Sequence, residues 1–579
     1  MTKSINSIRA LEYQSIAQRY FLLSLKKATR AIEIRDCELA ADWIHFAATL
    51  AWRTHPGLFY SNELETILAK IGQELTFQNI NFMDLPRLNN TSSNKKKILH
   101  VLSTVYLTGG HTRLVSRWVE NCKQYSTDQI HSIVITDQGE NVVPNWLVTS
   151  AKNCGGECII IPDNFTRMQK AFYLKSIAKE WADIIVLHIH PNDPIPNIAF
   201  SSMDCDIPIL FYNHADHVFS IGMSISDIIL DIRKSGQKVT CLERGFSDKS
   251  VLLPIPLINV TPLQNEDREG LRIEARKRLN ISLNEKIILT IGSEYKFKPA
   301  LGYNFLEVAK RILLTDSTIH IYAVGLPNVR LWKFLSDETK GHFHALGIIA
   351  DYKMLRDYYL AADIYIEGFP FGSLTAMLDA GLYMLPIQRM HNPNAPILSG
   401  DDIALDHLIL IANNEDEYKN NVVSLINTPS AIRNNLGQKI RCSILINHCG
   451  KAWVDKWLHP IMQIIESGAY KNINITQINN CQMDPKFSEK LNISLSQWQK
   501  HPIPILLDAL ISCTKLSRII RFRILLYVLQ DVNFRHLFPL KNLLRFSSLY
   551  TVELIMTFLP SQRHNDLRNY ISKIRKIVK

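Results

Sequence analysis

The first 75 residues carry apolar side chains at helical intervals. The segment "ELAADWIHFAATLAWR" spaces Leu39, Trp43, Phe46, Leu50 and Trp52 at about three to four residues, and "SNELETILAKIGQEL" has a similar spacing after a serine. This period predicts amphipathic helices, and a serine before the apolar run is a typical N-cap. We therefore expect a small helical domain over residues 1–88, followed by a polar linker, "NNTSSNKKK", at 89–97.

From residue 98 the pattern changes to short apolar runs that alternate with amphipathic segments. The runs "ILHVLS", "HSIVIT", "ECIIIP", "DIIVLHIH" and "IPILFYN" predict strands, and "HTRLVSRWVENCKQY" and "QKAFYLKSIAKEW" predict helices between them. After "VLLPIPL" at 251–257, a second set follows with "KIILTIG", "LGYNFLEVAKRILL", "IHIYAVG" and "ADIYIE". Such alternation predicts an α/β chain with parallel sheets. We expect two Rossmann-like domains, 98–257 and 271–465, that face a ligand-binding cleft.

Composition indicates an ordinary globular protein. The chain has 579 residues, of which 46% are hydrophobic and 21% charged. No apolar run reaches the roughly 18–20 residues that span a bilayer, and the first residues lack the apolar core of a signal peptide, so we expect a cytoplasmic protein. The ten cysteines form no CxxC pair, which argues against a zinc site and leads us to expect no bound metal.

The basic charge is concentrated at the C-terminus. Residues 481–579 contain sixteen Lys and Arg against six Asp and Glu, which is a net charge of +10 out of +11 for the whole chain. Lys and Arg alternate there with Leu, Ile and Phe at helical intervals. Such helices suit peripheral contact with an anionic membrane, but a helical bundle with a basic solvated face is favoured. The region has no recognised nucleic-acid motif, so we expect no nucleic-acid partner.

One stretch of the second set carries candidate chemistry. In "ADIYIEGFPFGSLTAMLDAG", a strand at 364–366 leads through a Gly-Pro-Gly turn to a helix that begins near Ser373. Thr375 and Asp379 are four residues apart and share one face of that helix. A helix N-terminus suits a phosphate, and Asp379 would then accept hydrogen bonds from a ribose diol. The alternative is that Asp379 pairs with an Arg or Lys and that Ser373 merely caps the helix.

Polar residues also follow the other predicted strands. Gly109, Gly110 and His111 follow the first strand; His190 follows the fourth; His214, Asp216 and His217 follow the fifth; and Lys296 and Lys298 follow the first strand of the second set. Each has a structural explanation, because Gly-Gly turns are common, histidines form structural hydrogen bonds and loop lysines are usually solvated. Their shared position at strand ends favours a site.

These residues resemble a known family. The two-domain layout, the Gly-Gly loop, "LLPIPL" and the closing helix "KAWVDKWLHP" resemble GT-B glycosyltransferases, over about 98–465. More closely, "KFKP", "FPFGSLTAMLD" and "NHADH" resemble the O-GlcNAc transferases and the bacterial cytosolic N-glycosyltransferases. The resemblance implies that Lys296 holds the nucleotide diphosphate and that Asp379 takes the ribose. It further implies that Ser373 and Thr375 meet the phosphate and that His214 lies near the acceptor. We expect these other residues to line the substrate site: Gly109, Gly110, His190, Asp216, His217, Gly292, Lys298, Phe371, Gly372 and Leu374.

The sequence departs from the wider pattern in two places. Many retaining GT-B enzymes carry two glutamates seven residues apart, whereas here Glu367 is followed at that spacing by Leu374, which favours inversion. Residues 1–75 do not form a long tetratricopeptide array of the kind found in nuclear O-GlcNAc transferases. The acceptor, protein or glycan, therefore stays open.

The expected reaction is transfer of a sugar from a nucleotide-sugar donor, UDP-linked by resemblance, with no separate cofactor. Lys296 and the helix N-terminus would stabilise the leaving diphosphate in place of a metal ion. His214 would orient or deprotonate the acceptor, with Asp216 and His217 as weaker candidates. Two alternatives stay open: a nucleotide-sugar 2-epimerase, which would not need a basic tail, and a non-catalytic GT-B-like protein that binds a sugar or scaffolds a partner.

Overall fold

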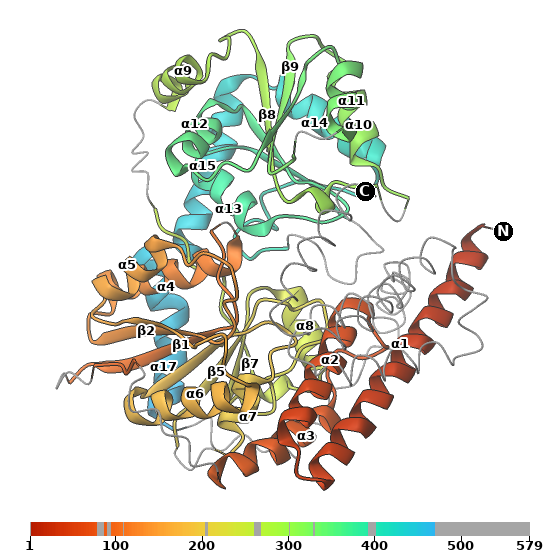
Figure 1. The fold of residues 1–579 in the computed structure, drawn as a ribbon. Helices are drawn as coiled ribbons and strands as arrows, with labels where there is room; N and C mark the ends of the chain where they lie inside the picture. Colours follow the sequence, from red (N-terminus) through yellow and green to blue (C-terminus); the bar gives the residue numbers. More distant parts are fainter. Residues whose placement is uncertain are drawn as a thin grey trace, which may run out of the picture.

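Two parallel sheets, one above the other in Figure 1, form the body of the molecule. The computed structural model describes residues 2–77, 86–89, 94–107, 109–202, 206–259, 268–299, 302–327, 330–391 and 401–468. The basic segment 481–579, for which the sequence predicts helices, lies outside the described residues. Within the described part, no helix is long and apolar enough to cross a membrane.

The N-terminal region is helical, as predicted. It consists of α1 (Thr2–Glu33), α2 (Cys37–Thr54), α3 (Asn62–Gln73) and a 3-10 turn, Glu74–Phe77. The hydroxyl of Ser61 caps α3 by accepting a hydrogen bond from the Leu64 N–H at 3.2 Å. The apolar faces of these helices, including Phe46 and Leu50, are buried in one core with one face of the first sheet.

A buried carboxylate fastens these helices to the first domain. Glu65 of α3 is 3% exposed and accepts hydrogen bonds from the N–H of Gly222 at 2.8 Å and the N–H of Ser224 at 2.9 Å. The Asn197 amide donates a further bond at 3.3 Å. The helical region is therefore held against the first sheet by directed bonds as well as by apolar contact.

The first sheet has seven parallel strands in the order β3-β2-β1-β4-β5-β6-β7. Five of the strands match the predicted apolar runs, and β6 and β7 extend the sheet. The strands are β1 (Lys96–Leu102), β2 (Gln129–Ile135), β3 (Cys158–Ile160), β4 (Ile184–His188), β5 (Ile209–Asn213), β6 (Ile228–Asp231) and β7 (Ser250–Leu252). The accompanying helices are α4 (Gly110–Tyr125), α5 (Asn145–Asn153), α6 (Arg167–Trp181), α7 (Ile195–Phe200), α8 (Lys234–Leu242) and the 3-10 turn Ser247–Lys249.

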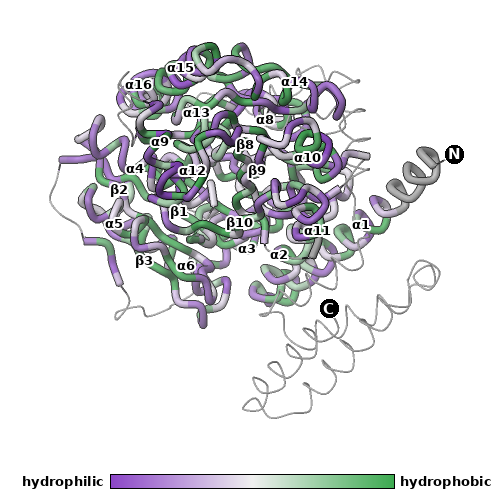
Figure 2. The backbone as a smooth tube through the Cα atoms, turned by 90° about the horizontal axis from the view of Figure 1, so that it is seen from above, coloured by the Kyte–Doolittle hydropathy of each residue, from purple (hydrophilic) through white to green (hydrophobic). Residues whose placement is uncertain are grey.

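The second sheet has six parallel strands in the order β10-β9-β8-β11-β12-β13. They are β8 (Lys286–Ile291), β9 (Ile319–Val324), β10 (Phe343–Gly347), β11 (Ile364–Ile366), β12 (Ile387–Met390) and β13 (Ile411–Ala412). The helices are α9 (Arg268–Leu279), the 3-10 turn Glu294–Lys296, α10 (Phe305–Leu313), α11 (Arg330–Glu338), α12 (Tyr352–Ala361), α13 (Leu374–Leu382), α14 (Glu415–Asn427) and α15 (Ser430–His448). Seen from above, the helices carry both hydrophobic and hydrophilic residues, as expected for helices that cover a sheet on one side (Figure 2).

The last described helices return to the first domain. After α15, the chain continues through α16 (Gly450–Trp453), a π-helical turn, Val454–Leu458, and α17 (His459–Glu466), which lies along the lower domain in Figure 1. The indole N–H of Trp453 donates to the Pro254 carbonyl at 2.8 Å, and its ring lies 5.7 Å from that of Trp118. The predicted tryptophan-rich closing helix therefore joins the two domains.

Candidate functional site

The loop before α13 carries residues predicted for the donor. Ser373 occupies the N-cap position, as predicted, but its hydroxyl does not cap the helix. It accepts a hydrogen bond from Lys296 Nζ at 3.0 Å, and the same ammonium donates to the Gly372 carbonyl at 2.7 Å. Gly292 packs against this hydroxyl, because a Cβ at Gly292 would approach Ser373 Oγ to 2.8 Å. These four predicted residues therefore meet beyond the carboxyl ends of β8 and β11.

A buried glutamate lies beside this loop. Glu367 follows β11, is 2% exposed, and accepts a hydrogen bond from the Ser373 backbone N–H through Oε1. Its Oε2 has no hydrogen-bond partner in the described part of the chain. Burial raises the pKa of Glu367 to about 7, although the nearby Lys296 ammonium acts in the opposite direction. The carboxyl therefore titrates near neutral pH next to the proposed diphosphate site.

A cation of the first domain acts electrostatically on Lys296. Burial lowers the pKa of Lys296, the Glu367 carboxylate opposes that shift, and the guanidinium of Arg233 adds to it. Arg233 directly precedes α8 in the first domain, whereas Lys296 belongs to the second. Cations from both sides of an interdomain cleft suit an anionic ligand.

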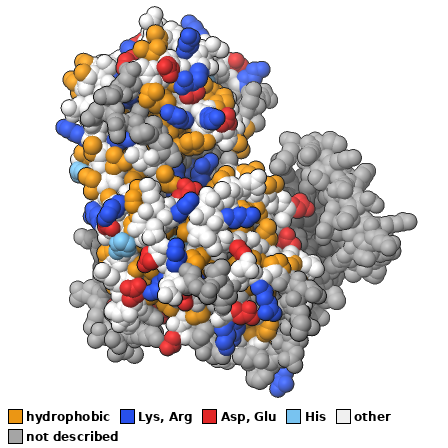
Figure 3. All heavy atoms as spheres, turned by 90° about the vertical axis from the view of Figure 1, so that its left-hand side faces the viewer, with side chains coloured by type: hydrophobic (Ala, Val, Ile, Leu, Met, Phe, Trp, Pro, Cys, Tyr) orange, Lys and Arg blue, Asp and Glu red, His pale blue; other side chains and the backbone are white. Residues whose placement is uncertain are grey.

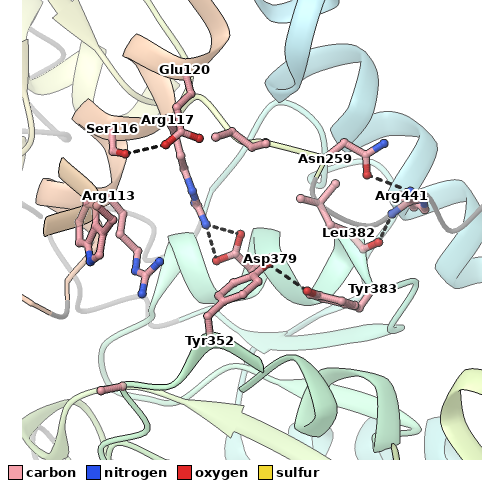
Figure 4. A pocket seen from close by; sticks show the side chains of 13 residues that line it. Arg113, Ser116, Arg117, Glu120, Asn259, Tyr352, Asp379, Leu382, Tyr383 and Arg441 are labelled. Atoms are coloured by element: carbon pink, nitrogen blue, oxygen red, sulfur yellow. Dashed lines mark hydrogen bonds and ion pairs between the residues drawn. The ribbon is translucent and has the colours of Figure 1, made fainter. Parts of the chain in front are cut away.

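The predicted ribose carboxylate forms an ion pair between the domains. Both oxygens of Asp379 accept hydrogen bonds from Nη2 of Arg117 on α4, each at 2.9 Å. The pair lines an interdomain cavity of about 310 Å³, shown in Figure 4, together with Arg113, Tyr352 and Arg441. The alternative that Asp379 pairs with an arginine is therefore what the structure shows. The ribose contact stays a prediction, because each carboxylate oxygen keeps a further lone pair.

The two domains touch where α4 and α13 begin. Gly109 has a φ of 143°, which favours glycine, and it precedes the first residue of α4, Gly110. A Cβ at Gly110 would lie 2.7 Å from the Thr375 hydroxyl, so only a glycine permits this approach. The predicted Gly-Gly turn therefore brings the start of α4 next to the start of α13.

Three imidazoles gather at the carboxyl edge of the first sheet. The His214 ring, after β5, lies 4.5 Å from that of His111, which in turn lies 5.9 Å from that of His190. Burial lowers the pKa of His214 well below its ordinary value, so this imidazole is neutral at pH 7. His111 donates through Nε2 to the His188 carbonyl at 2.9 Å, which leaves its buried Nδ1 as an acceptor with no partner in the described chain.

Asp216 and His217 belong to a separate ion-pair network. Asp216 is fully buried and accepts hydrogen bonds from Arg233 Nε at 2.6 Å and Nη2 at 2.9 Å. Burial acts to raise the pKa of Asp216, but the Arg233 guanidinium outweighs it and holds the pKa below its usual range. His217 lies 3.1 Å from the same carboxylate. Asp216 thus orients Arg233 in the structure, and its predicted contact with substrate stays a prediction.

Three further predicted residues flank the donor loop. Lys298 is exposed and pairs with Glu294 at 3.2 Å. The ring of Phe371 lies 6.1 Å from that of Tyr295, and Leu374 is the first residue of α13. Among the described residues, the Lys298 ammonium makes no hydrogen bond to the donor loop, in contrast to that of Lys296.

A second cavity, of about 420 Å³, lies between α2 and the carboxyl edge of the first sheet. The rings of Trp52, from α2, and Tyr106 each stack with that of His190 at 6.1 Å between centroids. Polar side chains complete the lining, among them Arg53, Ser103, Asp137, Asn141 and Asn192. Through His190 and His111, this cavity adjoins His214.

Comparison with solved structures agrees with the two-sheet architecture, although the sequence matches no protein-family model and no curated protein. A glycosyltransferase from Rickettsia africae is similar at a TM-score of 0.50 and 14% identity, over 66% of this chain and 99% of that chain. The chain has the GT-B fold. The fold predicted from the sequence is therefore confirmed.

Two further similar structures have lower scores. One is a mutant of the O-GlcNAc transferase from Thermobaculum terrenum, with 11% identity and a TM-score of 0.45 over 79% of this chain and 85% of that one. The other is the UDP-GlcNAc 2-epimerase from Neisseria meningitidis, bound to UDP-GlcNAc, with 13% identity and a TM-score of 0.41 over 65% and 100%. Identities this low show a fold, so activity must be argued from the site.

In this GT-B chain, sequence reasoning missed Arg117 and Arg233 and assigned no role to His111. One signal was available: Arg113 and Arg117 are four residues apart and so share the face of α4 that meets α13.

In the described part of the chain, no group of three or more His, Cys, Asp or Glu side chains has a metal-binding arrangement. On the face shown in Figure 3, positive and negative side chains are interspersed.

Proposed function

We propose that this GT-B chain is a glycosyltransferase that moves a sugar from a UDP-linked donor to a protein or glycan acceptor without a metal ion. The observation that carries the proposal is the contact of Lys296 with Gly372 and Ser373 beyond the ends of β8 and β11. Because Gly110 and Thr375 meet across the cleft, this donor loop lies next to the start of α4, where His111 adjoins His214.

These groups suit each part of a transfer reaction. An acceptor hydroxyl oxygen bonds to the anomeric carbon, while the bond from that carbon to the diphosphate breaks and its electron pair leaves with the diphosphate. Lys296, helped by the more distant charge of Arg233, would stabilise the charge on this leaving group. His214, neutral at pH 7, would take the acceptor proton. A substrate hydroxyl would also satisfy the unpaired Nδ1 of His111.

Asp379 would bind the ribose while it stays paired with Arg117. Arg117 uses one nitrogen to contact both carboxylate oxygens, so the cavity side of the carboxylate can still accept hydroxyl protons. The cavity of about 310 Å³ falls within the usual size range of small-molecule sites.

The cavity between α2 and the first sheet would take the acceptor. Its volume of about 420 Å³ suits one or two sugar rings or a short side-chain segment. Aromatic rings beside polar groups suit the apolar faces and the hydroxyl edges of a sugar. The aromatic lining therefore favours a glycan over a peptide, and the N-terminal helices would take part in acceptor binding.

The test is a screen of the full chain with UDP-glucose, UDP-galactose, UDP-GlcNAc, UDP-GalNAc and GDP-mannose. We expect one donor to raise the melting temperature and to release its nucleotide diphosphate slowly in water. Lys296→Ala should lose both effects, whereas Lys298→Ala, which alters an exposed lysine two residues away, should keep them. Conversion to an epimeric nucleotide-sugar without release of diphosphate would indicate the epimerase instead. No stabilisation by any donor would refute the proposal.

A further inference from the structure

Four buried histidines form an unbroken hydrogen-bonded chain across the first sheet. His214 Nε2 lies 2.9 Å from His188 Nδ1, His188 Nε2 lies 3.0 Å from His100 Nδ1, and His100 Nε2 lies 2.9 Å from His131 Nδ1. The last ring, His131, places Nε2 at 3.1 Å from Oε1 of Gln129. Every link joins an Nε2 to an Nδ1, so the rings run head to tail.

Strand register produces this arrangement. His131 on β2 is paired with Ile98 on β1, two residues before His100. His188 on β4 is paired with Leu102, two residues beyond His100. Each step to the next strand thus advances two residues toward the carboxyl edge, which keeps the side chains on one face of the sheet. The chain therefore rises diagonally from Gln129, the first residue of β2, to the mouth of the cleft.

The interior of the histidine chain is closed to solvent. His100, His131 and His188 are each 0% exposed. The Trp118 ring packs edge-on against His100 and His188 at 5.5 and 5.9 Å between centroids. No carboxylate is hydrogen-bonded to any of these three rings among the described residues. All three are therefore held neutral, with one N–H and one unprotonated nitrogen each.

One terminal group then determines every proton position. The amide oxygen of Gln129 only accepts, so Nε2 of His131 must carry the hydrogen and Nδ1 of His131 must accept. The same reasoning places the hydrogen on Nε2 of His100 and then of His188. At the end of the chain, His214 donates through Nε2 and keeps Nδ1 unprotonated. Its Nδ1 has no hydrogen-bond partner within the described chain.

We infer that His188, His100 and His131, ended by Gln129, are positioning residues that hold His214 in the tautomer whose Nδ1 accepts the acceptor proton. This inference rests on the proposed function for its catalytic consequence, but the tautomer itself does not depend on any activity. A base that carried its hydrogen on Nδ1 would present a donor to the acceptor hydroxyl and could not take its proton.

The tautomer is tested first on the full chain labelled with ¹⁵N-histidine. Nitrogen chemical shifts distinguish an N–H from an unprotonated ring nitrogen, and single replacements of each chain histidine assign the signals. We expect all four rings to be in the Nε2–H form at pH 7. A His214 signal from the Nδ1–H form would overturn the inference, whether or not the protein transfers a sugar.

Two variants of Gln129 then test the role at a distance. Gln129→Leu removes the terminal acceptor. Because a buried N–H without an acceptor is costly, the hydrogen bonds of the histidine chain should reverse direction, which puts the hydrogen on His214 Nδ1. The kcat should fall about tenfold with the KM for the donor unchanged. Gln129→Met keeps a neutral group of similar length that only accepts, and it should retain the tautomer and most of kcat. His344→Phe is the control. It removes a similar hydrogen bond between two histidines on the second sheet, in which His344 Nε2 lies 3.0 Å from His320 Nδ1, and it should leave kcat unchanged.

The outcomes separate the two proposals. If both Gln129 variants fold and keep the wild-type tautomer and kcat, the chain does not position His214. If both lose kcat equally, the chain is only structural. If neither wild type nor any variant transfers a sugar, but the nitrogen shifts show the Nε2–H form, the proposed function is wrong and the tautomer assignment is correct.

Discussion

Asp379 and Arg117 join the two domains through one guanidinium nitrogen that lies 2.9 Å from each carboxylate oxygen. The residues lie 262 positions apart, on α13 and α4. Their side chains are 23% and 13% exposed, so the pair is mostly buried but still reached by solvent. Asp379 has two roles to test, in the domain interface and in nucleotide binding. Replacing Asp379 affects both roles, whereas replacing Arg117 affects the interface alone.

Asp379→Asn should weaken UDP binding by roughly 1–3 kcal/mol, because an amide presents a donor where the ribose diol needs an acceptor. Isothermal titration calorimetry with UDP measures this loss. Arg117→Gln is the matched control, since it breaks the same ion pair but leaves the carboxylate. Each variant should lower the free energy of unfolding by about 2 kcal/mol, between the values for exposed and buried pairs. Equal UDP affinity in wild type and Asp379→Asn would leave Asp379 with the interface role alone.

Lys296→Ala should slow transfer by about 3 kcal/mol in activation free energy, because it removes a charge from the leaving group. The fold should survive, since the Lys296 ammonium donates, within the described residues, only to the Gly372 carbonyl and the Ser373 hydroxyl of the loop before α13. Steady-state kinetics and a thermal melt measure the two effects. Lys298→Ala is the control, and a Lys296→Ala enzyme with near-normal kcat would remove Lys296 from the catalytic site.

Glu367 should make stability depend on pH near neutrality. Its pKa is raised from 4.5 to about 7 in the folded chain, so between these values the folded chain holds a proton that the unfolded chain has lost. This contribution is present below pH 4.5 and is lost as pH rises through about 7. From pH 6 to pH 8 the loss should be about 1 kcal/mol.

The comparison is between wild type and Glu367→Gln, because the buried histidines also titrate and their contribution cancels in the difference. The melting temperature of wild type minus that of the Gln variant should become smaller between pH 6 and pH 8. Identical slopes for the two proteins would mean that Glu367 does not titrate in this range.

Transfer should continue in excess EDTA, because Lys296 and Arg233 supply positive charge from both domains. The rate with the donor identified in the screen is measured before and after chelation. Loss of activity that magnesium or manganese restores would show that these cations are insufficient.

Local signals explain what the sequence could predict. The strand, turn and helix around Ser373 lie within twenty residues, and turn residues and apolar period determine each part. The gathering of Lys296 with Ser373 follows from the rule that parallel strands end at one edge. In contrast, β6 was not predicted, although it is no shorter than β3 and β11, which were.

Long-range partners could not be predicted in the same way. The sequence left open whether Asp379 faces a cation, but nothing near it indicates Arg117. The histidine chain depends on a register shift of two residues at each strand, which no local pattern determines. A weaker signal was readable: His100, His131 and His188 lie in or at the end of apolar runs, where a polar residue needs a partner.

The last prediction concerns the acceptor. Trp52 lies on α2, outside both Rossmann-like domains, and its ring stacks with that of His190 beside the cavity of about 420 Å³. If this cavity binds a glycan acceptor, Trp52→Ala should raise the KM for that acceptor about tenfold through loss of ring contact, while donor hydrolysis in water stays unchanged. Tyr106→Ala, at the other side of His190, should act in the same direction. Trp146→Ala is the matched control, because Trp146 lines the interdomain cavity instead and contacts Arg113 at 5.3 Å. Kinetics with the acceptor varied at saturating donor distinguish these variants. A Trp52→Ala enzyme with an unchanged acceptor KM would show that α2 takes no part in acceptor binding.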